Sequence, residues 1–232
     1  MFGRRKRDDD SAPSGAASPA DAPAPLPTVD GPRANGPWDA SERPGEGEGY
    51  LDFGALRVRG RVGLQVQIPQ ETGKAPGAVV LMSQDSGLEL RAFAAARSTS
   101  LWDQVRPELA AEVDRLEGTH REVEGPYGTE LHVRVPAKTA EGEEAFQPSR
   151  IVGVDGPRWM LRATFLGKAA LEPDDEGLLM QALRDVVVVR GEDPRPVREP
   201  LLVEVPQQVR DAVDARQADA APAPDDEGTR EA

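Results

Sequence analysis

The chain has 232 residues, a net charge of −13 at neutral pH and no cysteine. An acidic chain repels the phosphate backbone of nucleic acids and anionic membrane surfaces, so we expect neither as a partner. The lack of cysteine excludes disulfides, thiol nucleophiles and thiolate metal sites.

The two ends differ from the middle. Residues 1–50 hold eight prolines and almost no apolar periodicity, so they cannot bury enough surface to offset the entropy lost on ordering. Residues 211–232 carry seven acidic residues, two arginines and no aromatic. We therefore predict disordered tails at 1–50 and 211–232, and one domain at 51–210 that is large enough for a proper core.

The basic cluster Arg4-Arg5-Lys6-Arg7 precedes acidic and small residues rather than an apolar run. It therefore lacks the pattern of an export signal. No stretch approaches the roughly eighteen apolar residues of a membrane helix. We expect a cytoplasmic protein.

Trp38 stands out in the N-terminal tail, in the stretch Gly36-Pro37-Trp38-Asp39. A tryptophan in such a segment usually docks on another surface. Two interpretations stay open, namely that Trp38 packs on its own domain or that it anchors a partner.

The middle begins with short alternating segments. Apolar residues alternate with glutamines over residues 63–69, which predicts a half-buried strand. The apolar run 78–82 predicts a central strand, and residues 88–94 return as its antiparallel partner. These segments predict a three-stranded meander.

A helix is predicted next. Ser100 is suited to cap its first turn, and Gly118 fits its end. Apolar residues recur at helical spacing at Trp102, Val105, Leu109, Val113 and Leu116. Pro107 removes one interior hydrogen bond, so we expect a kink there.

Residues 119–123 and 129–135 form a predicted hairpin whose register depends on its loop. A loop of two or four residues sets His120 and Glu122 beside Leu131 and Val133. A three-residue loop, 125–127, gathers the apolar residues on one face, and we choose it for that reason.

The chosen register sets His120 opposite His132 and Glu122 opposite Glu130. Two imidazoles and carboxylates across a hairpin could hold zinc or a similar ion. The same residue types also suit a solvent-facing hairpin, so the metal site is the alternative hypothesis.

A second hairpin is predicted around the turn Asp155-Gly156. One of its faces is apolar, with Val152, Val154, Trp159, Leu161, Ala163 and Phe165. The other face carries Arg158, Met160 and Arg162. Together with Arg91 and Phe93 on the earlier strand, these side chains have the composition of a protein-binding patch, or of an ordinary solvated face.

A second helix is predicted to open at Pro173, and the β-branched run 186–189 is suited to end it early. Residues 201–205 are a last candidate strand. The order of elements predicts an α+β fold, an antiparallel sheet with two helices packed on one face. The other face of the sheet is then either exposed to solvent or a binding surface.

Catalytic signatures do not occur in the sequence. Residues 45–49 alternate Gly and Glu, but they follow no strand, open no helix and lack a lysine, so they are not a phosphate loop. The G-x-S-x-G, H-E-x-x-H and Walker patterns are also missing. We expect no enzymatic activity and no cofactor.

Four stretches together resemble a domain-of-unknown-function family of actinobacterial proteins. They are Phe2-Gly3-Arg4-Arg5, Gly36-Pro37-Trp38-Asp39, Leu101-Trp102-Asp103 and the segment from Asp155 to Arg162. The resemblance implies a source and a cytoplasmic setting, and no catalytic residue. The order of strands and helices is similar to that of Mog1/PsbP-like sandwiches, which mainly bind other proteins or assist assemblies.

The leading hypothesis is a non-catalytic protein-binding or accessory module. It places the partner, another protein, on a surface made of Trp38, Arg91, Phe93, Arg158, Met160 and Arg162. The alternative is a protein that binds a metal or small ligand through His120 and His132. A third hypothesis assigns partner capture to the acidic tails.

Overall fold

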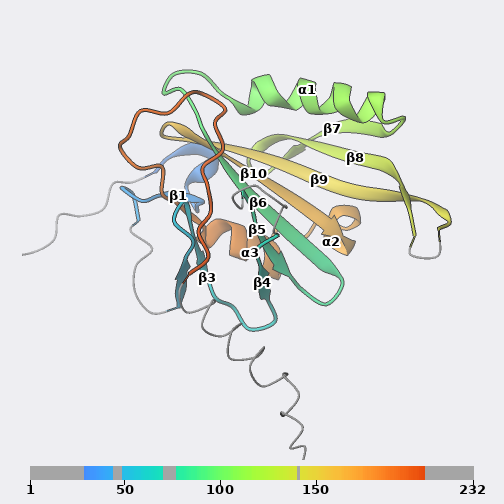
Figure 1. Ribbon diagram of the computed structural model, residues 1–232, viewed down its shortest axis with the longest axis horizontal. Helices are drawn as coiled ribbons and strands as arrows, with labels where there is room; N and C mark the ends of the chain where they lie inside the picture. The colour runs from blue at the N-terminus through green and yellow to red at the C-terminus, as the bar shows by residue number, and fades with distance from the viewer. Residues whose placement is uncertain (1–28, 44–48, 70–76, 140–141, 207–232) are drawn as a thin grey trace, which may run out of the picture.

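The computed structural model describes residues 29–43, 49–69, 77–139 and 142–206, and they form a mixed α+β fold with two sheets (Figure 1). The larger sheet has seven antiparallel strands in the order β4 (Gln65–Gln67), β5 (Val79–Met82), β6 (Ser86–Ala94), β10 (Trp159–Gly167), β9 (Glu144–Gly156), β8 (Gly128–Lys138) and β7 (Thr119–Gly125). The predicted meander is confirmed, since β4, β5 and β6 pair in sequence.

The smaller sheet joins distant parts of the chain. Its strands follow the order β1 (Trp38–Asp39), β11 (Val187–Val188), β3 (Leu56–Arg59) and β2 (Tyr50–Asp52), and β1 runs parallel to β11. The amide of Trp38 donates to the carbonyl of Val186 at 2.8 Å. Residues 29–43 thus belong to the folded domain, although the predicted domain begins only at residue 51. The rest of the predicted tails lies mostly outside the described residues.

The helices lie on both faces of the larger sheet, which corrects the expectation of one covered face. A single 3₁₀ turn, η1 (Gly31–Arg33), precedes β1, and the α-helices are α1 (Trp102–Arg115), α2 (Lys168–Leu171) and α3 (Leu178–Asp185). Leu161 and Leu183 meet in the main core, between the larger sheet and the smaller sheet with α3. Met160 instead packs with Trp102 under α1. Because successive strand residues face opposite ways, α1 and α3 cover opposite faces.

The β9–β10 hairpin keeps its predicted faces but not its predicted turn. Gly156 pairs with Trp159, so Pro157 and Arg158 form the turn, and Arg158 has a φ of 64°. The pairing shifts by an even number of residues, which leaves every side chain on its predicted face. The six predicted apolar side chains are all buried in the main core.

The second predicted helix begins later than expected. Its first residue is Leu178, and Val186 already has extended backbone angles. Val187 and Val188 continue as β11, which confirms that the β-branched run ends the helix. The predicted last strand is reduced to isolated bridges, including Gly54 with Val203.

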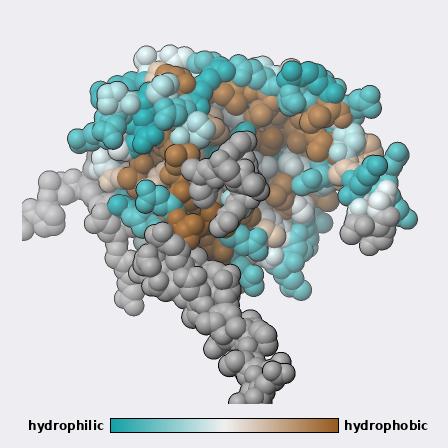
Figure 2. Space-filling model, viewed as in Figure 1, coloured by the Kyte–Doolittle hydropathy of each residue, from teal (hydrophilic) through white to brown (hydrophobic). Residues whose placement is uncertain are grey.

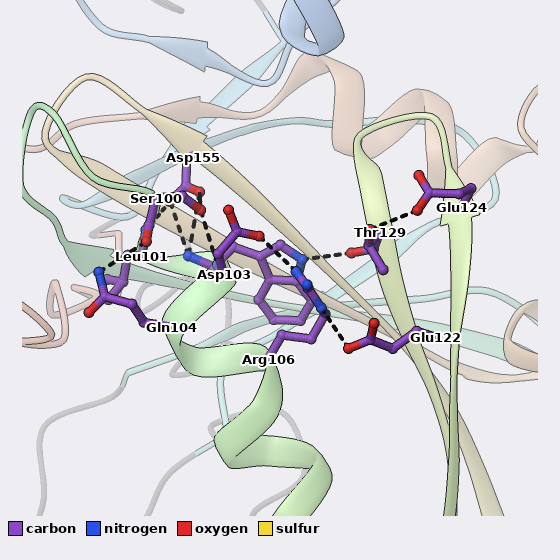
Figure 3. A network of polar contacts seen from close by, with 10 residues as sticks. Ser100, Leu101, Asp103, Gln104, Arg106, Glu122, Glu124, Thr129 and Asp155 are labelled. Carbon is purple, nitrogen blue, oxygen red and sulfur yellow. Dashed lines mark hydrogen bonds and ion pairs between the residues drawn. The ribbon is translucent and has the colours of Figure 1, made fainter.

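Asp155 at the end of β9 holds the first turn of α1 (Figure 3). Its carboxylate accepts hydrogen bonds from the Ser100 hydroxyl at 2.7 Å and from the amides of Leu101 and Trp102 at 3.1 and 3.3 Å. Ser100 Oγ accepts in turn from the amide of Asp103 at 3.0 Å, as the capping pattern predicts. A carboxylate at this position satisfies free amides and complements the helix dipole.

Side-chain contacts fix the rest of α1 to the sheet. The indole of Trp102 donates to the carbonyl of Thr129 at 2.7 Å. Arg106 donates to Asp103 and to Glu122, both at 2.9 Å. The hydrogen bond from Arg106 lowers the pKa of Asp103. The helix runs on through Pro107 as one element. No helix among the described residues is both long and apolar enough to cross a membrane.

Replacing Asp155 by alanine is expected to lower the free energy of unfolding by about 2 kcal/mol, because two amides and a hydroxyl lose their acceptor. Urea unfolding followed by circular dichroism measures the change. The matched control is Glu112→Ala, which removes an exposed ion pair to Arg115 on the same helix and should cost less than about 0.5 kcal/mol. Equal losses in the two variants would contradict the role of Asp155.

Candidate functional site

The β7–β8 hairpin does not bring the predicted metal ligands together. Gly125 pairs with Gly128, so the loop has two residues, and His120 pairs with Val133 while His132 pairs with Arg121. The two histidines therefore lie on opposite faces of the sheet. The described residues hold no group of three or more His, Asp or Glu side chains that could bind a metal ion.

The register prediction was wrong because it assumed one apolar and one wet face. Both faces of β8 are covered at residues 130–133. Leu131 and Val133 pack under α1, whereas Glu130 points to the other side and is 2% exposed. A Cβ on Gly125 would lie 1.9 Å from a Glu130 carboxylate oxygen, so the turn leaves room for this buried side chain.

Glu130 forms a buried ion pair with Arg150 of β9, a residue that the sequence analysis did not single out. The guanidinium donates to both carboxylate oxygens at 2.6 and 2.8 Å, and the two side chains are 2% and 3% exposed. Arg150 also lies 3.6 Å from Asp175 and 5.0 Å above the ring of Phe165. The bidentate geometry compensates for the desolvation of both charges.

The two histidines have separate surroundings. His132 Nε2 lies 3.5 Å from a Glu130 oxygen and makes no hydrogen bond within the described residues. Burial lowers the pKa of His132. His120 Nε2 lies 3.3 Å from Asp114 of α1, and Glu122 binds Arg106, so the other half of the predicted quartet faces α1.

The face of the larger sheet that carries α1 is only partly covered. Figure 2 shows apolar residues in a band below α1, with hydrophilic residues around it. We call this surface the open face and define it by the half-buried side chains Phe93, Leu109, Val135 and Ile151, together with Arg162. Arg162 lies over the ring of Phe93 at 5.6 Å.

The six predicted binding residues fall into three places. Arg91, Phe93 and Arg162 are neighbours on the open face, where Arg91 donates to Glu89 at 2.9 Å. Met160 belongs to the same face but is 1% exposed under α1.

The remaining two predicted residues lie elsewhere. Arg158 sits in the β9–β10 turn. Trp38 packs on its own domain in the smaller sheet, with the Arg43 guanidinium 4.4 Å from its ring, which supports the first of its two interpretations. The predicted patch is therefore not one surface.

Removing one partner of the buried ion pair is expected to be costly. Arg150→Met should lower the free energy of unfolding by about 3–5 kcal/mol, because Glu130 then remains charged and buried. The double variant Glu130→Leu, Arg150→Met should lose less than this single variant, as measured by urea unfolding. The control Lys168→Met breaks an exposed pair with Glu172 and should cost less than about 1 kcal/mol. A double variant less stable than Arg150→Met would contradict this account.

The buried imidazole of His132 predicts a pH dependence of stability. Its pKa is lowered from the ordinary 6.5, so the folded state binds the proton more weakly than the unfolded state. The contribution of neutral His132 to the free energy of unfolding is fully present above the ordinary pKa. It is lost as the pH falls from there towards the pKa of the folded state. His132→Asn should thus reduce the loss of unfolding free energy between about pH 7.5 and pH 5. The control is His120→Asn, which leaves His132 in place, and an identical pH profile for His132→Asn and wild type would contradict the prediction.

Comparisons with known proteins show a family and a weak likeness to a solved structure. A crystal structure of a protein from Bacteroides thetaiotaomicron is similar over 69% of this chain and 54% of its own, at 13% identity and a TM-score of 0.40. A likeness at this level carries no argument about fold or function. No curated protein matches the sequence.

The family model described as "Protein of unknown function (DUF3710)" matches residues 36–212. The match begins beside β1 and continues past the last described residue, so it includes both sheets, all three α-helices, the open face and the buried ion pair. The chain belongs to the DUF3710 family.

Proposed function

We propose that this protein is a non-catalytic binding or accessory module, and that another protein docks on the open face. The observation that carries the proposal is the incomplete cover of that face. α1 packs against β7, β8 and β9, and it leaves half-buried apolar side chains along the band below it (Figure 2). A contiguous apolar surface with a polar rim is typical of a protein interaction site.

Arg162 supports the choice of this surface. Its Nε has no hydrogen-bond partner within the described residues, and Glu89 lies 4.0 Å from its guanidinium. Burial lowers the pKa of Arg162. A partner carboxylate beside the guanidinium would add to the long contact with Glu89, and Arg and Phe are both enriched at interfaces.

The surroundings of the predicted chemical groups support a non-catalytic role. Glu122 is held by Arg106 and Glu130 by Arg150. Carboxylates engaged in such ion pairs are poor general bases, because their lone pairs already accept hydrogen bonds.

We also propose that the protein comes from an actinobacterium and is cytoplasmic. Its accessory role would be like that of Mog1/PsbP-like proteins. The composition supports the actinobacterial source, since the chain has 24 arginines and 4 lysines, a ratio typical of GC-rich genomes.

The test is photo-crosslinking of the full chain in its own cells. A benzoylphenylalanine at position 135 or 109 should give one discrete adduct, because both positions belong to the open face. The matched control is position 171 on α2, where Leu171 is 56% exposed on the opposite side of the sheet. Mass spectrometry identifies the adduct.

The outcomes separate the hypotheses. The same partner at positions 135 and 109, and none at 171, supports docking on the open face. Adducts of equal yield at all three positions, or none at positions 135 and 109, would contradict docking on the open face. A Leu109→Arg change should also abolish the adduct at position 135, because it places a charge in the apolar band.

A further inference from the structure

A second surface of the molecule gathers arginines around a hollow of about 730 Å³. The hollow lies between the β9–β10 turn, the residues that follow β1 and the segment that follows β11. The charged side chains in its lining are Asp39, Arg97, Arg158, Arg190 and Glu192. Its volume is in the range of sites for small ligands.

Two of these guanidinium groups converge on one backbone oxygen. Arg158 and Arg190 each donate to the carbonyl of Gly191 at 3.3 Å, and Arg190 also donates to the carbonyl of Asp193 at 2.8 Å. Arg190 is 9% exposed, and its Nε has no hydrogen-bond partner within the described residues. Buried donors are almost always paired, and this Nε is a donor that the described residues leave without an acceptor.

Carboxylates near the hollow are engaged elsewhere or exposed. Asp39 accepts hydrogen bonds from the indole of Trp159 at 2.7 Å and from the amide of Ser41 at 2.9 Å. Glu199 pairs with Arg195 at 3.1 Å. Among the described residues, neither Arg158 nor Arg190 has a carboxylate within ion-pair distance.

The two like charges therefore lie close together, and none of the nearby carboxylates forms a direct ion pair with either of them. Burial lowers the pKa of Arg190, and the positive charges of Arg158 and Arg195 add to this effect, while Glu199 and Asp193 oppose it. A bound anion would relieve the repulsion and accept the free hydrogen bond of Arg190.

We propose that this hollow binds the phosphate group of a small molecule, with Arg158 and Arg190 as its two principal ligands and Arg97 at the rim. Two adjacent guanidinium groups match a doubly charged phosphate better than a single carboxylate. Their planar fork geometry also suits phosphate oxygens. The site goes beyond the proposed docking function and does not rest on it, since it uses none of the residues that define the open face.

The test is titration of the full chain with pyrophosphate as the probe. Calorimetry should show saturable binding, which Arg158→Asn weakens about tenfold or more by removing a charged hydrogen bond. Asparagine is chosen because it tolerates the positive φ of this turn position. The control Arg134→Asn removes one positive charge at an exposed position of β8. The affinity of this variant for pyrophosphate should stay within about twofold of wild type if the effect of Arg158 is local.

A second measurement does not depend on a variant. In a spectrum of arginine side chains, the Nε–H signal of Arg190 should shift on adding pyrophosphate, because this donor gains an acceptor. Saturable binding together with this shift supports the proposal. No binding, or binding that Arg158→Asn leaves unchanged, overturns it. Tighter binding of citrate than of pyrophosphate overturns the assignment to phosphate in favour of a carboxylate ligand.

Discussion

The carboxylate of Asp155 ties the end of β9 to the first turn of α1, and much of the fold follows from that contact. Asp155 caps the helix from within the ladder, and the turn of the β9–β10 hairpin consists of Pro157 and Arg158. The same contact fixes the start of α1, which packs over β7 to β9 and leaves side chains of β6 and β10 on that face half-buried. The turn that carries Arg158 into the hollow follows this aspartate directly in the chain.

Burial on two sides is the second constraint. Strand β8 packs Leu131 under α1 and turns Glu130 towards the opposite face, where Arg150 neutralises it. A central strand with helices or sheet on both faces admits a charged residue only with a partner of this kind. The ion pair is therefore a structural element of the core, although it consists of residue types that are common in active sites.

Elements that depend on one local signal could be predicted from the sequence. The alternation over 63–69, the cap at Ser100 and the β-branched run from Val186 predicted a strand, a helix start and a helix end. Elements that depend on a distant contact could not be predicted. No local sequence pattern shows that the Asp155 side chain accepts hydrogen bonds from α1 rather than from the turn. Arg150 stands directly before Ile151 and Val152, but the sequence shows neither that its side chain is buried nor that Glu130 is its partner.

The parallel pair of β1 and β11 has a consequence for the order of folding. Trp38 and Val187 lie 149 positions apart in the sequence, yet they are direct neighbours in the smaller sheet. During synthesis the segment that contains Trp38 emerges early and has no strand to join until β11 follows it. The meander and the hairpins β7–β8 and β9–β10 consist of local pairings. They can form as soon as their own strands have been synthesised. The smaller sheet therefore cannot close before Val187 and Val188 have left the ribosome, late in the synthesis of the domain.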